Sequence, residues 1–366
     1  MIDIRSGTMI PAANLEITMM KSTIVTSALA LITAAPVAFA HHSRVAMYDM
    51  NSTTEIEGEI TRILWRNPHI RFWIKSEVAG ETVLWLVEST PPGTLERHGI
   101  GREILSVGQT IRVAGPPGRH DVHAMEARNL LLPDGREVLI QRDSEPRWSE
   151  RTLGWAALNL SDVEVDAAET GATGIFRVWS RDEDPSFRVR EGSSLTLIGL
   201  SEYPLTASAR LTRQNFDPVA DNPIPGCTPK GMPHIVGQPY PVEFVNEGER
   251  ILLRIEEYDL TRVINMMNAP ALGEPTSLGH STGRWDGDSL VVTTSSILAP
   301  QFSAGIPLND SAYVEERFEL SDDQTHLNYR VTVTDPVTFT ESVTREKYWI
   351  WIPGVEIQPY QCTVEE

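Results

Sequence analysis

The chain has 366 residues and a formal net charge of −19, because 50 acidic residues outnumber 31 lysines and arginines. An acidic surface of this size repels phosphate groups, which argues against nucleic acid and anionic lipid as partners. The length exceeds that of a usual single hydrophobic core and therefore favours two domains.

Residues 1–40 are expected to be an over-extended start followed by a secretory signal peptide. Lys21 precedes the mostly apolar segment 24–37, and Ala38 and Ala40 form a small-x-small cleavage pattern. Cleavage after Ala40 makes His41 the first residue of the mature protein, and the alternative is an uncleaved membrane anchor. The predicted location is periplasmic or secreted, and no integral membrane segment is expected after cleavage.

The predicted first domain covers residues 41–141. Apolar and polar residues alternate in the first of five segments that we expect to be strands, and Gly99 ends a short helix predicted over 92–98. The five strands are expected at 55–65, 70–75, 82–88, 109–114 and 124–132. A helix between the third and fourth of five strands is typical of an OB-like five-stranded barrel.

Three histidines fall in loops of this predicted barrel. His69 lies between the first two strands, and His120 and His123 lie between the last two. Those loops flank the usual binding face of an OB barrel, and imidazole is a common ligand of copper and zinc. The alternative is that these histidines are solvated or bonded to the backbone.

His41 and His42 extend the metal hypothesis to the expected start of the mature chain. A free His41 offers its α-amine and ring Nδ1 to one ion, and a further histidine would complete a copper site. The segment 41–53 is long enough to reach the loop histidines. The alternative is a polar, unstructured start of the mature protein.

Four motifs of residues 41–140 carry a family resemblance: HHSRVAMYD, EGEITRILWRNPHIRFWI, VGQTIRVAGPPGR and LLLPDGREV. They resemble an exported bacterial domain family of unknown function, whose members begin His-His-Ser after the signal and carry a W-x-N-P-H turn. The resemblance implies export and a small β-barrel. We add Trp65 and Asn67 as candidate ligand-binding residues. The positions that match the family are His41, His42, Ser43, Trp65, Asn67, Pro68 and His69.

A linker is expected over 142–171, followed by a second domain over 172–362. A short helix is predicted near 206–213, and the segment 217–233 is a loop rich in proline and glycine. Seven later segments are expected to be strands: 242–245, 250–257, 261–265, 289–294, 314–320, 327–334 and 338–352. The predicted fold class is all-β, with the OB-like barrel followed by an antiparallel lipocalin-like barrel whose interior would hold a small apolar ligand.

The two cysteines, Cys227 and Cys362, are expected to form a disulfide in an oxidising compartment. It would join the loop at 217–233 to the C-terminal end of the second domain. Two buried thiols and a soft metal pair are the alternatives.

The segment Gly279–Gly283 matches G-x-S-x-G, the nucleophile turn of α/β-hydrolases. That chemistry needs a buried strand before the serine and a helix after it. Here a loop precedes the serine and a hairpin, RWDGDSLVV, follows it, so a serine hydrolase is not supported.

The motifs CTPKGMPHI, PYPVEFV, LGHSTGRWDGDSLVV and YQC resemble a second uncharacterised exported bacterial β-domain family over residues 172–362. The chain departs from that pattern at His234, where the family usually has arginine. The alternative is that the polar residues of LGHSTGRWDGDSLVV belong to a turn stabilised by aspartate side chains. Candidate ligand-binding residues from the match are His280, Arg284, Trp285 and Asp286, and Asp288 also matches.

Three hypotheses for function follow. The first is a non-catalytic binding protein for a small ligand or for copper or zinc. The second is a copper-dependent enzyme that uses His41, and the third is an interaction module with a protein partner in the cell envelope. No catalytic residue is identified, and the cofactor stays unknown, with copper or zinc open.

Overall fold

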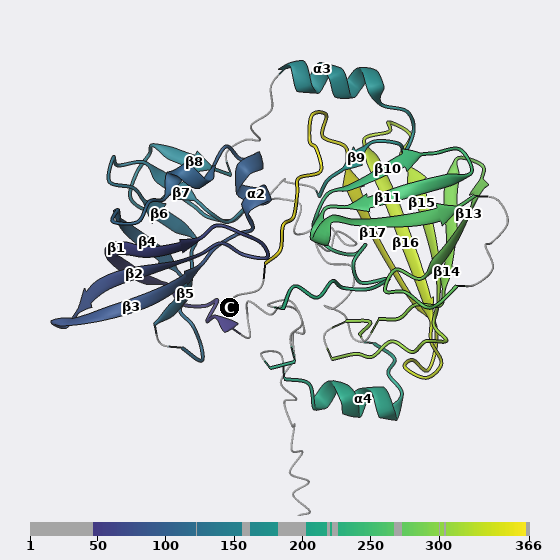
Figure 1. Ribbon diagram of the computed structural model, residues 1–366, viewed down its shortest axis with the longest axis horizontal. Coiled ribbons are helices and arrows are strands. Elements are labelled where there is room, and N and C mark those ends of the chain that lie inside the picture. The colour runs from purple at the N-terminus through teal and green to yellow at the C-terminus, as the bar shows by residue number, and fades with distance from the viewer. Residues whose placement is uncertain are drawn as a thin grey trace, which may run out of the picture. The chain divides into compact units, whose positions relative to one another are not determined.

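The protein is known from a computed structural model, which contains two β-sheets and few helices (Figure 1). This architecture confirms the all-β prediction. The structure describes residues 47–121, 123–155, 162–181, 203–217, 220–221, 226–266, 273–299, 301–303 and 305–363.

The first sheet has eight strands in the order β5-β3-β2-β1-β4-β6-β7-β8. Alternation in β1 buries Ile56 and Ile60 on one face, as predicted. The strands are β1 (Thr54–Leu64), β2 (Arg71–Val78), β3 (Glu81–Glu88), β4 (Thr110–Gly115), β5 (Ala124–Glu126), β6 (Asn129–Leu131), β7 (Glu137–Leu139) and β8 (Thr152–Gly154).

A single segment of the first sheet pairs with two separate strands. β5 runs parallel to β3, and β6 runs antiparallel to β4. Only Ala127 and Arg128 separate β5 from β6, and their N–H groups bond to the carbonyls of Glu88 and Ala114 at 2.7 and 2.8 Å. Residues 124–131 therefore link β3 to β4, which are separated in the sheet by β2 and β1.

The short helix α2 (Pro92–Arg97) confirms the helix predicted between the third and fourth strands. Proline occupies its first turn, where no backbone donor is needed, and Gly99 follows it at φ 72°. A 3-10 helix, η1 (Arg102–Ile104), leads to β4.

The first sheet extends past residue 141, into the segment that the sequence analysis assigns to the linker. β8 pairs with β7. The fully buried Glu137 carboxylate accepts the backbone N–H groups of Arg147, Trp148 and Ser149 at 2.8–2.9 Å. These bonds attach the chain up to residue 155 to the sheet, and helix α3 (Asp162–Gly171) follows.

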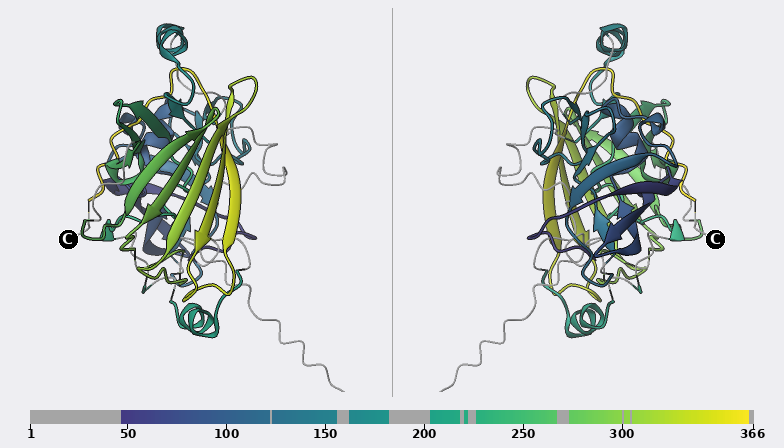
Figure 2. Two further views of the ribbon diagram at one scale, coloured as in Figure 1. Left: turned by 90° about the vertical axis from the view of Figure 1, so that its right-hand side faces the viewer. Right: turned by 90° about the vertical axis from the view of Figure 1, so that its left-hand side faces the viewer.

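The second sheet has nine strands in the order β17-β16-β15-β14-β13-β12-β11-β10-β9. Figure 2 shows the later strands of this sheet, green to yellow, side by side. The strands are β9 (Val178–Trp179), β10 (Val242–Asn246), β11 (Arg250–Ile255), β12 (Leu260–Asn265), β13 (His280–Asp286), β14 (Ser289–Ser295), β15 (Tyr313–Leu320), β16 (His326–Thr334) and β17 (Val343–Ile350).

The two edges of the second sheet meet. Ser180, next to β9, and Ile350 of β17 exchange two backbone hydrogen bonds of 2.9 and 2.8 Å, which makes this sheet a nearly closed barrel. Every neighbouring pair is antiparallel except β12 and β13, which run parallel. That pair departs from the purely antiparallel order that the sequence predicts.

The interior of the barrel is rich in aromatic side chains. Phe318 lies 4.9 Å from Tyr329, and Tyr329 lies 5.2 Å from Trp349, measured between ring centroids. All three side chains are at most 1% exposed. Burial of such large apolar surfaces stabilises the barrel.

Local predictions in the second domain hold in three places. Helix α4 (Ala207–Gln214) has Thr206 as its N-cap. β13 and β14 form the predicted hairpin, with Gly287 at φ 60°. Cys227 and Cys362 form the predicted disulfide.

A buried ion pair crosses the barrel interior. Arg262 of β12 bonds to Glu316 of β15, and neither side chain is more than 1% exposed. The guanidinium also donates to Ser281 at 2.9 Å and to Thr294 at 2.6 Å, and Tyr329 donates to the carboxylate at 2.8 Å. The pair is therefore surrounded by hydrogen-bond partners, as a buried charge pair requires.

A buried lysine, Lys347 of β17, faces the same interior without a carboxylate partner among the described residues. Its ammonium donates to the carbonyls of Val236 and Gln238 at 3.1 and 3.3 Å and lies 3.9 Å from the centroid of the Trp349 ring. Burial lowers the pKa of Lys347 to about 7.

Lys347→Met is expected to change how stability depends on pH. The pKa of Lys347 is about 7 in the folded state and about 10 in the unfolded state. Between these two pH values, Lys347 of the wild type is protonated only in the unfolded chain. The free energy of unfolding of the wild type therefore rises with pH in this window. We expect the free energy of unfolding of Lys347→Met, relative to the wild type, to fall by about 1 kcal/mol per pH unit.

Urea unfolding at a series of pH values measures this difference. Lys75→Met removes an exposed lysine of β2 and is the matched control, which should follow the wild type at every pH. Parallel pH curves for Lys347→Met and the wild type would contradict the prediction.

Candidate functional site

The turn that carries His69 joins β1 to β2. The His69 Nδ1 atom lies 3.0 Å from the carbonyl oxygen of Ser89 and 3.3 Å from Glu88 Oε1. Arg71 also contacts the Glu88 carboxylate, at 3.3 Å. Because both groups at Nδ1 are acceptors, the geometry favours the tautomer that carries its proton on Nδ1.

Two adjacent glutamates lie in the second sheet, where β11 leads into the 3-10 helix η4 (Glu257–Asp259). Glu256 is 3% exposed and accepts both terminal nitrogens of Arg97, from α2, at 2.9 Å. It also accepts the backbone N–H of Gln358 at 3.0 Å. A bidentate pair of this kind fixes the position of η4.

Glu257 is the second buried glutamate and is 2% exposed. Its Oε1 atom accepts a hydrogen bond from Lys230, which also donates to the side chain of Gln238 at 3.0 Å. Burial raises the pKa of Glu257, while Lys230 and His69 act in the opposite direction. The Oε2 atom has no hydrogen-bond partner within the described part of the chain.

Three tyrosines lie close enough to this carboxylate to feel its charge. The Tyr360 ring centroid lies 4.9 Å from that of Tyr258 and 5.6 Å from that of Tyr240. Burial, together with the nearby Glu257 charge, raises the pKa of all three phenols. We call Glu257, Tyr240, Tyr258 and Tyr360 the glutamate–tyrosine cluster.

The phenol groups of the glutamate–tyrosine cluster interact with one another. The Tyr360 hydroxyl lies against those of Tyr240 and Tyr258, although the contacts of the Tyr258 and Tyr360 hydroxyls depart from ideal hydrogen-bond geometry. Glu257 Oε2 is a buried polar atom of the cluster with no partner among the described residues. Native proteins leave few such atoms, and each one asks for a binding explanation.

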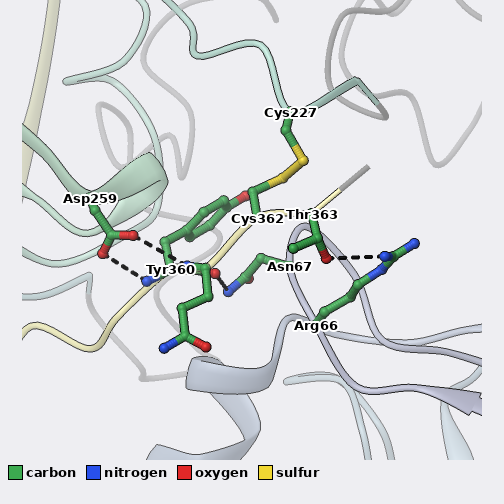
Figure 3. The surroundings of a disulfide bond; sticks show 8 residues. Arg66, Asn67, Cys227, Asp259, Tyr360, Cys362 and Thr363 are labelled. Carbon is green, nitrogen blue, oxygen red and sulfur yellow. Dashed lines mark hydrogen bonds between the residues drawn. A yellow bond between two sulfur atoms is a disulfide. The ribbon is translucent and has the colours of Figure 1, made fainter. Parts of the chain in front are cut away.

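Contacts made by the C-terminal segment, residues 358–363, fix the position of Tyr360 (Figure 3). The Asp259 carboxylate accepts the backbone N–H groups of Tyr360 and Gln361 at 2.8 and 3.2 Å. Asn67 donates to the Tyr360 carbonyl, and Cys362 is bonded to Cys227. The turn next to His69 and the end of the described chain therefore meet at the glutamate–tyrosine cluster.

The backbone around the cluster is strained at several positions. Tyr258, Asp259, Cys227 and Gln361 all have φ between 43° and 65°. Residues other than glycine rarely adopt this left-handed conformation, and such strain concentrates at functional sites.

The structure places the predicted binding residues Trp65 and Asn67 beside the cluster's supports. The Trp65 indole nitrogen donates to Glu96 of α2 at 3.3 Å. Asn67 is 5% exposed and bonds to Tyr360. Asn67 therefore contacts the backbone of the cluster, and Trp65 contacts helix α2, which carries Arg97.

The predicted metal ligands of the first domain are not brought together among the residues described. His120 and His123 are exposed, and His123 packs 5.4 Å from the Trp85 ring. No group of three potential ligands occurs in the described ranges. His41 and His42 lie outside those ranges, so a copper or zinc site at them stays a prediction.

The predicted binding residues of β13 have contacts with residues outside the glutamate–tyrosine cluster. His280 bonds to the Glu274 carbonyl at 2.9 Å, and Asp286 pairs with Arg317 at 2.8 Å. Trp285 packs 6.2 Å from the Phe176 ring. Arg284 is an exposed neighbour on the same strand. The contacts of Asp286 are those of a side chain that supports the end of a hairpin.

Sequence reasoning did not find Glu257, Lys230 or the three tyrosines. The strand predicted over 250–257 places Glu256 and Glu257 on opposite faces, yet both are buried because the chain leaves β11 at Ile255. The sequence did contain one signal of this site: two acidic residues followed by a tyrosine at the end of a predicted strand.

Residues 29–126 match the sequence profile of a Family of unknown function (DUF6152). The matched residues include the turn from Asn67 to His69 and Glu88, but none of the glutamate–tyrosine cluster. The match supports the resemblance of the N-terminal part of the chain to an uncharacterised family. A search of curated proteins finds no match for the chain.

Proposed function

We propose that this chain is an exported two-domain protein that binds a small polar ligand at the glutamate–tyrosine cluster, beside His69. The observation that carries the proposal is the buried Glu257 carboxylate, whose Oε2 atom has no hydrogen-bond partner among the described residues and whose charge acts on three buried phenols. A ligand that donates a hydrogen bond to this atom offsets the cost of burying it.

The surroundings of the cluster support a preorganised binding site. Its side chains come from three separate segments, which Arg97–Glu256, Lys230–Glu257 and the disulfide hold in position. A few convergent polar groups among aromatic rings are typical of small-molecule sites.

Two features support the proposed location and fold types. The disulfide favours a periplasmic or secreted protein, since disulfides persist in oxidising compartments. The parallel β3–β5 pair and the antiparallel β1–β4 pair favour an OB-like first domain, and the closure between Ser180 and Ile350 favours a lipocalin-like second domain.

No helix among the residues placed by the structure is long and apolar enough to cross a membrane.

A thermal-shift panel tests the proposal with small amines, carboxylates, alcohols, amides and sugars. At least one class is expected to raise the melting temperature of the wild type, because a ligand that binds only the folded state stabilises it. The double variant Tyr258→Phe/Tyr360→Phe should lose this response, since it lacks two of the three phenol groups of the cluster.

The matched control is Tyr313→Phe, which removes an exposed phenol of β15 and should respond as the wild type does. The proposal is contradicted if no class shifts the wild type, or if the double variant responds equally.

A further inference from the structure

We propose that the Cys227–Cys362 disulfide is a site of thiol–disulfide exchange, at which a dithiol reductant frees the C-terminal segment and exposes the Glu257 carboxylate. This inference rests on the proposed function and names how access to that site is controlled. In the exchange the dithiol is oxidised to its own disulfide, and its two electrons and two protons pass to Cys227 and Cys362, which become thiols.

Each cysteine lies close in the chain to a side chain of the candidate site (Figure 3). Lys230, three residues after Cys227, donates a hydrogen bond to Glu257 Oε1. Tyr360, two residues before Cys362, packs 4.9 Å from the Tyr258 ring, and the Glu257 charge acts on its phenol. One covalent bond therefore ties the segment of the cation that pairs with Glu257 to the segment of a ring beside it.

The other polar contacts of the C-terminal segment are single hydrogen bonds. Residues 351–363 form neither a helix nor a strand, and a chain end is poorly ordered unless it is tied down. The backbone N–H groups of Gln358, Tyr360 and Gln361 donate to carboxylates at 2.8–3.2 Å. Because each such bond contributes only modestly, the disulfide is the main constraint on local opening of this segment.

The sulfur atoms are within reach of a reductant. Both cysteines are only half-buried, and their chain neighbours Gly226, Thr228, Gln361 and Thr363 are exposed. Exchange requires a thiolate to approach one sulfur atom directly, so exposed disulfides are the labile ones.

The backbone at the bond also favours opening. Cys227 has φ 54°, and Gln361, next to Cys362, has φ 43°. Residues other than glycine rarely adopt this left-handed conformation, and such strain concentrates at switch regions. Reduction lets both positions return to ordinary backbone conformations.

Opening of the segment changes the surroundings of Glu257. Its side chain is 2% exposed in the oxidised chain, and its Oε2 atom has no partner within the described ranges. Departure of Tyr360 and loosening of Lys230 admit water and solutes to this atom. The disulfide therefore sets how fast a ligand reaches the proposed binding site.

Carboxyl footprinting of the full chain tests the inference without any ligand. The oxidised chain and the chain reduced by dithiothreitol are treated with a carbodiimide and glycine ethyl ester, and tandem mass spectrometry locates the labelled glutamates. Glu257 is expected to react at least about tenfold faster in the reduced chain, because loss of the covalent constraint lowers the free energy of local opening. Glu137 and Glu316, both fully buried, should stay unlabelled in both states and report that the two sheets remain folded.

Two variants locate the effect. Cys227→Ser/Cys362→Ser should show fast labelling of Glu257 with and without dithiothreitol. Thr363→Ala removes the acceptor of a 3.0 Å hydrogen bond from Arg66 but keeps the disulfide, so its oxidised form should protect Glu257 as the wild type does.

Three results would overturn the inference. The first is a folded oxidised chain that dithiothreitol reduces only after a denaturant is added, and the second is a reduced chain in which Glu257 stays protected. The third is labelling of Glu137 or Glu316 together with Glu257, since the bond would then support the whole fold rather than access to one site. None of these results measures ligand binding, which the thermal-shift panel decides separately.

Discussion

Glu316→Gln is expected to lower the free energy of unfolding by about 3–5 kcal/mol. The substitution keeps the shape of the side chain but leaves the Arg262 guanidinium charged inside the barrel, where it is 1% exposed. A buried charge that loses its partner costs far more than the pair itself contributes. Denaturant unfolding followed by tryptophan fluorescence measures the loss.

Arg262→Met/Glu316→Leu is expected to recover most of this loss, because two apolar side chains of similar volume replace the pair. Ser281 and Thr294 still bond to each other at 3.0 Å in such a variant. Tyr329 alone would lose its acceptor, so the recovery should stop about 1–3 kcal/mol short of the wild type.

The control is the exposed pair Arg330–Glu346 on neighbouring strands, whose side chains are 60% and 57% exposed. Glu346→Gln should change the free energy of unfolding by less than about 1 kcal/mol. A double variant at Arg262 and Glu316 that is less stable than Glu316→Gln would contradict the explanation.

Cys227→Ser/Cys362→Ser is expected to cost about 3–5 kcal/mol of unfolding free energy. The bond closes a loop with a sequence separation of 135 residues, and a long loop restricts the unfolded chain strongly. Thermal unfolding with and without reductant measures the effect. Reductant should destabilise the wild type to the level of the variant and leave the variant unchanged.

Hydrogen exchange gives a second readout for the same variant. The amides of Tyr360 and Gln361, which bond to Asp259, should lose protection when the disulfide is absent. The amide of Ile140, which bonds to the carbonyl of Arg128 at 2.9 Å in the first domain, should keep its protection. Unchanged protection at Tyr360 would show that the disulfide does not hold the C-terminal segment.

Local sequence signals predicted much of the fold. The alternation around Ile56 and Ile60, the proline and glycine that bound α2, and the Asp-Gly turn at Gly287 each act within a few residues. Such patterns are set by backbone geometry and need no distant partner.

The pairings missed by sequence reasoning join distant segments. Nothing near Ser180 indicates that it bonds to Ile350, and nothing in β12 indicates a parallel neighbour in β13. The addition of β8 to the first sheet depends on three backbone N–H groups that reach Glu137. Long-range contacts of this kind are fixed by packing, which has no local signature.

The sequence predicted only part of the candidate site. The W-x-N-P-H motif identified the turn of His69, and the cysteine count identified the disulfide. Glu257, Lys230 and Tyr360 come from three segments whose proximity exists only after folding. Their types gave no warning, since glutamate and lysine are mostly exposed and tyrosine is intermediate in burial.

The position of Tyr360 in the chain has a consequence for biosynthesis. Its neighbours at the glutamate–tyrosine cluster are synthesised about a hundred residues earlier, and Asn67, which bonds to its carbonyl, about three hundred residues earlier. A ribosome-bound chain therefore exposes these groups to solvent until the C-terminal segment emerges. The glutamate–tyrosine cluster and the Cys227–Cys362 bond are therefore completed only after residues 360–362 have been synthesised, which makes them late products of folding.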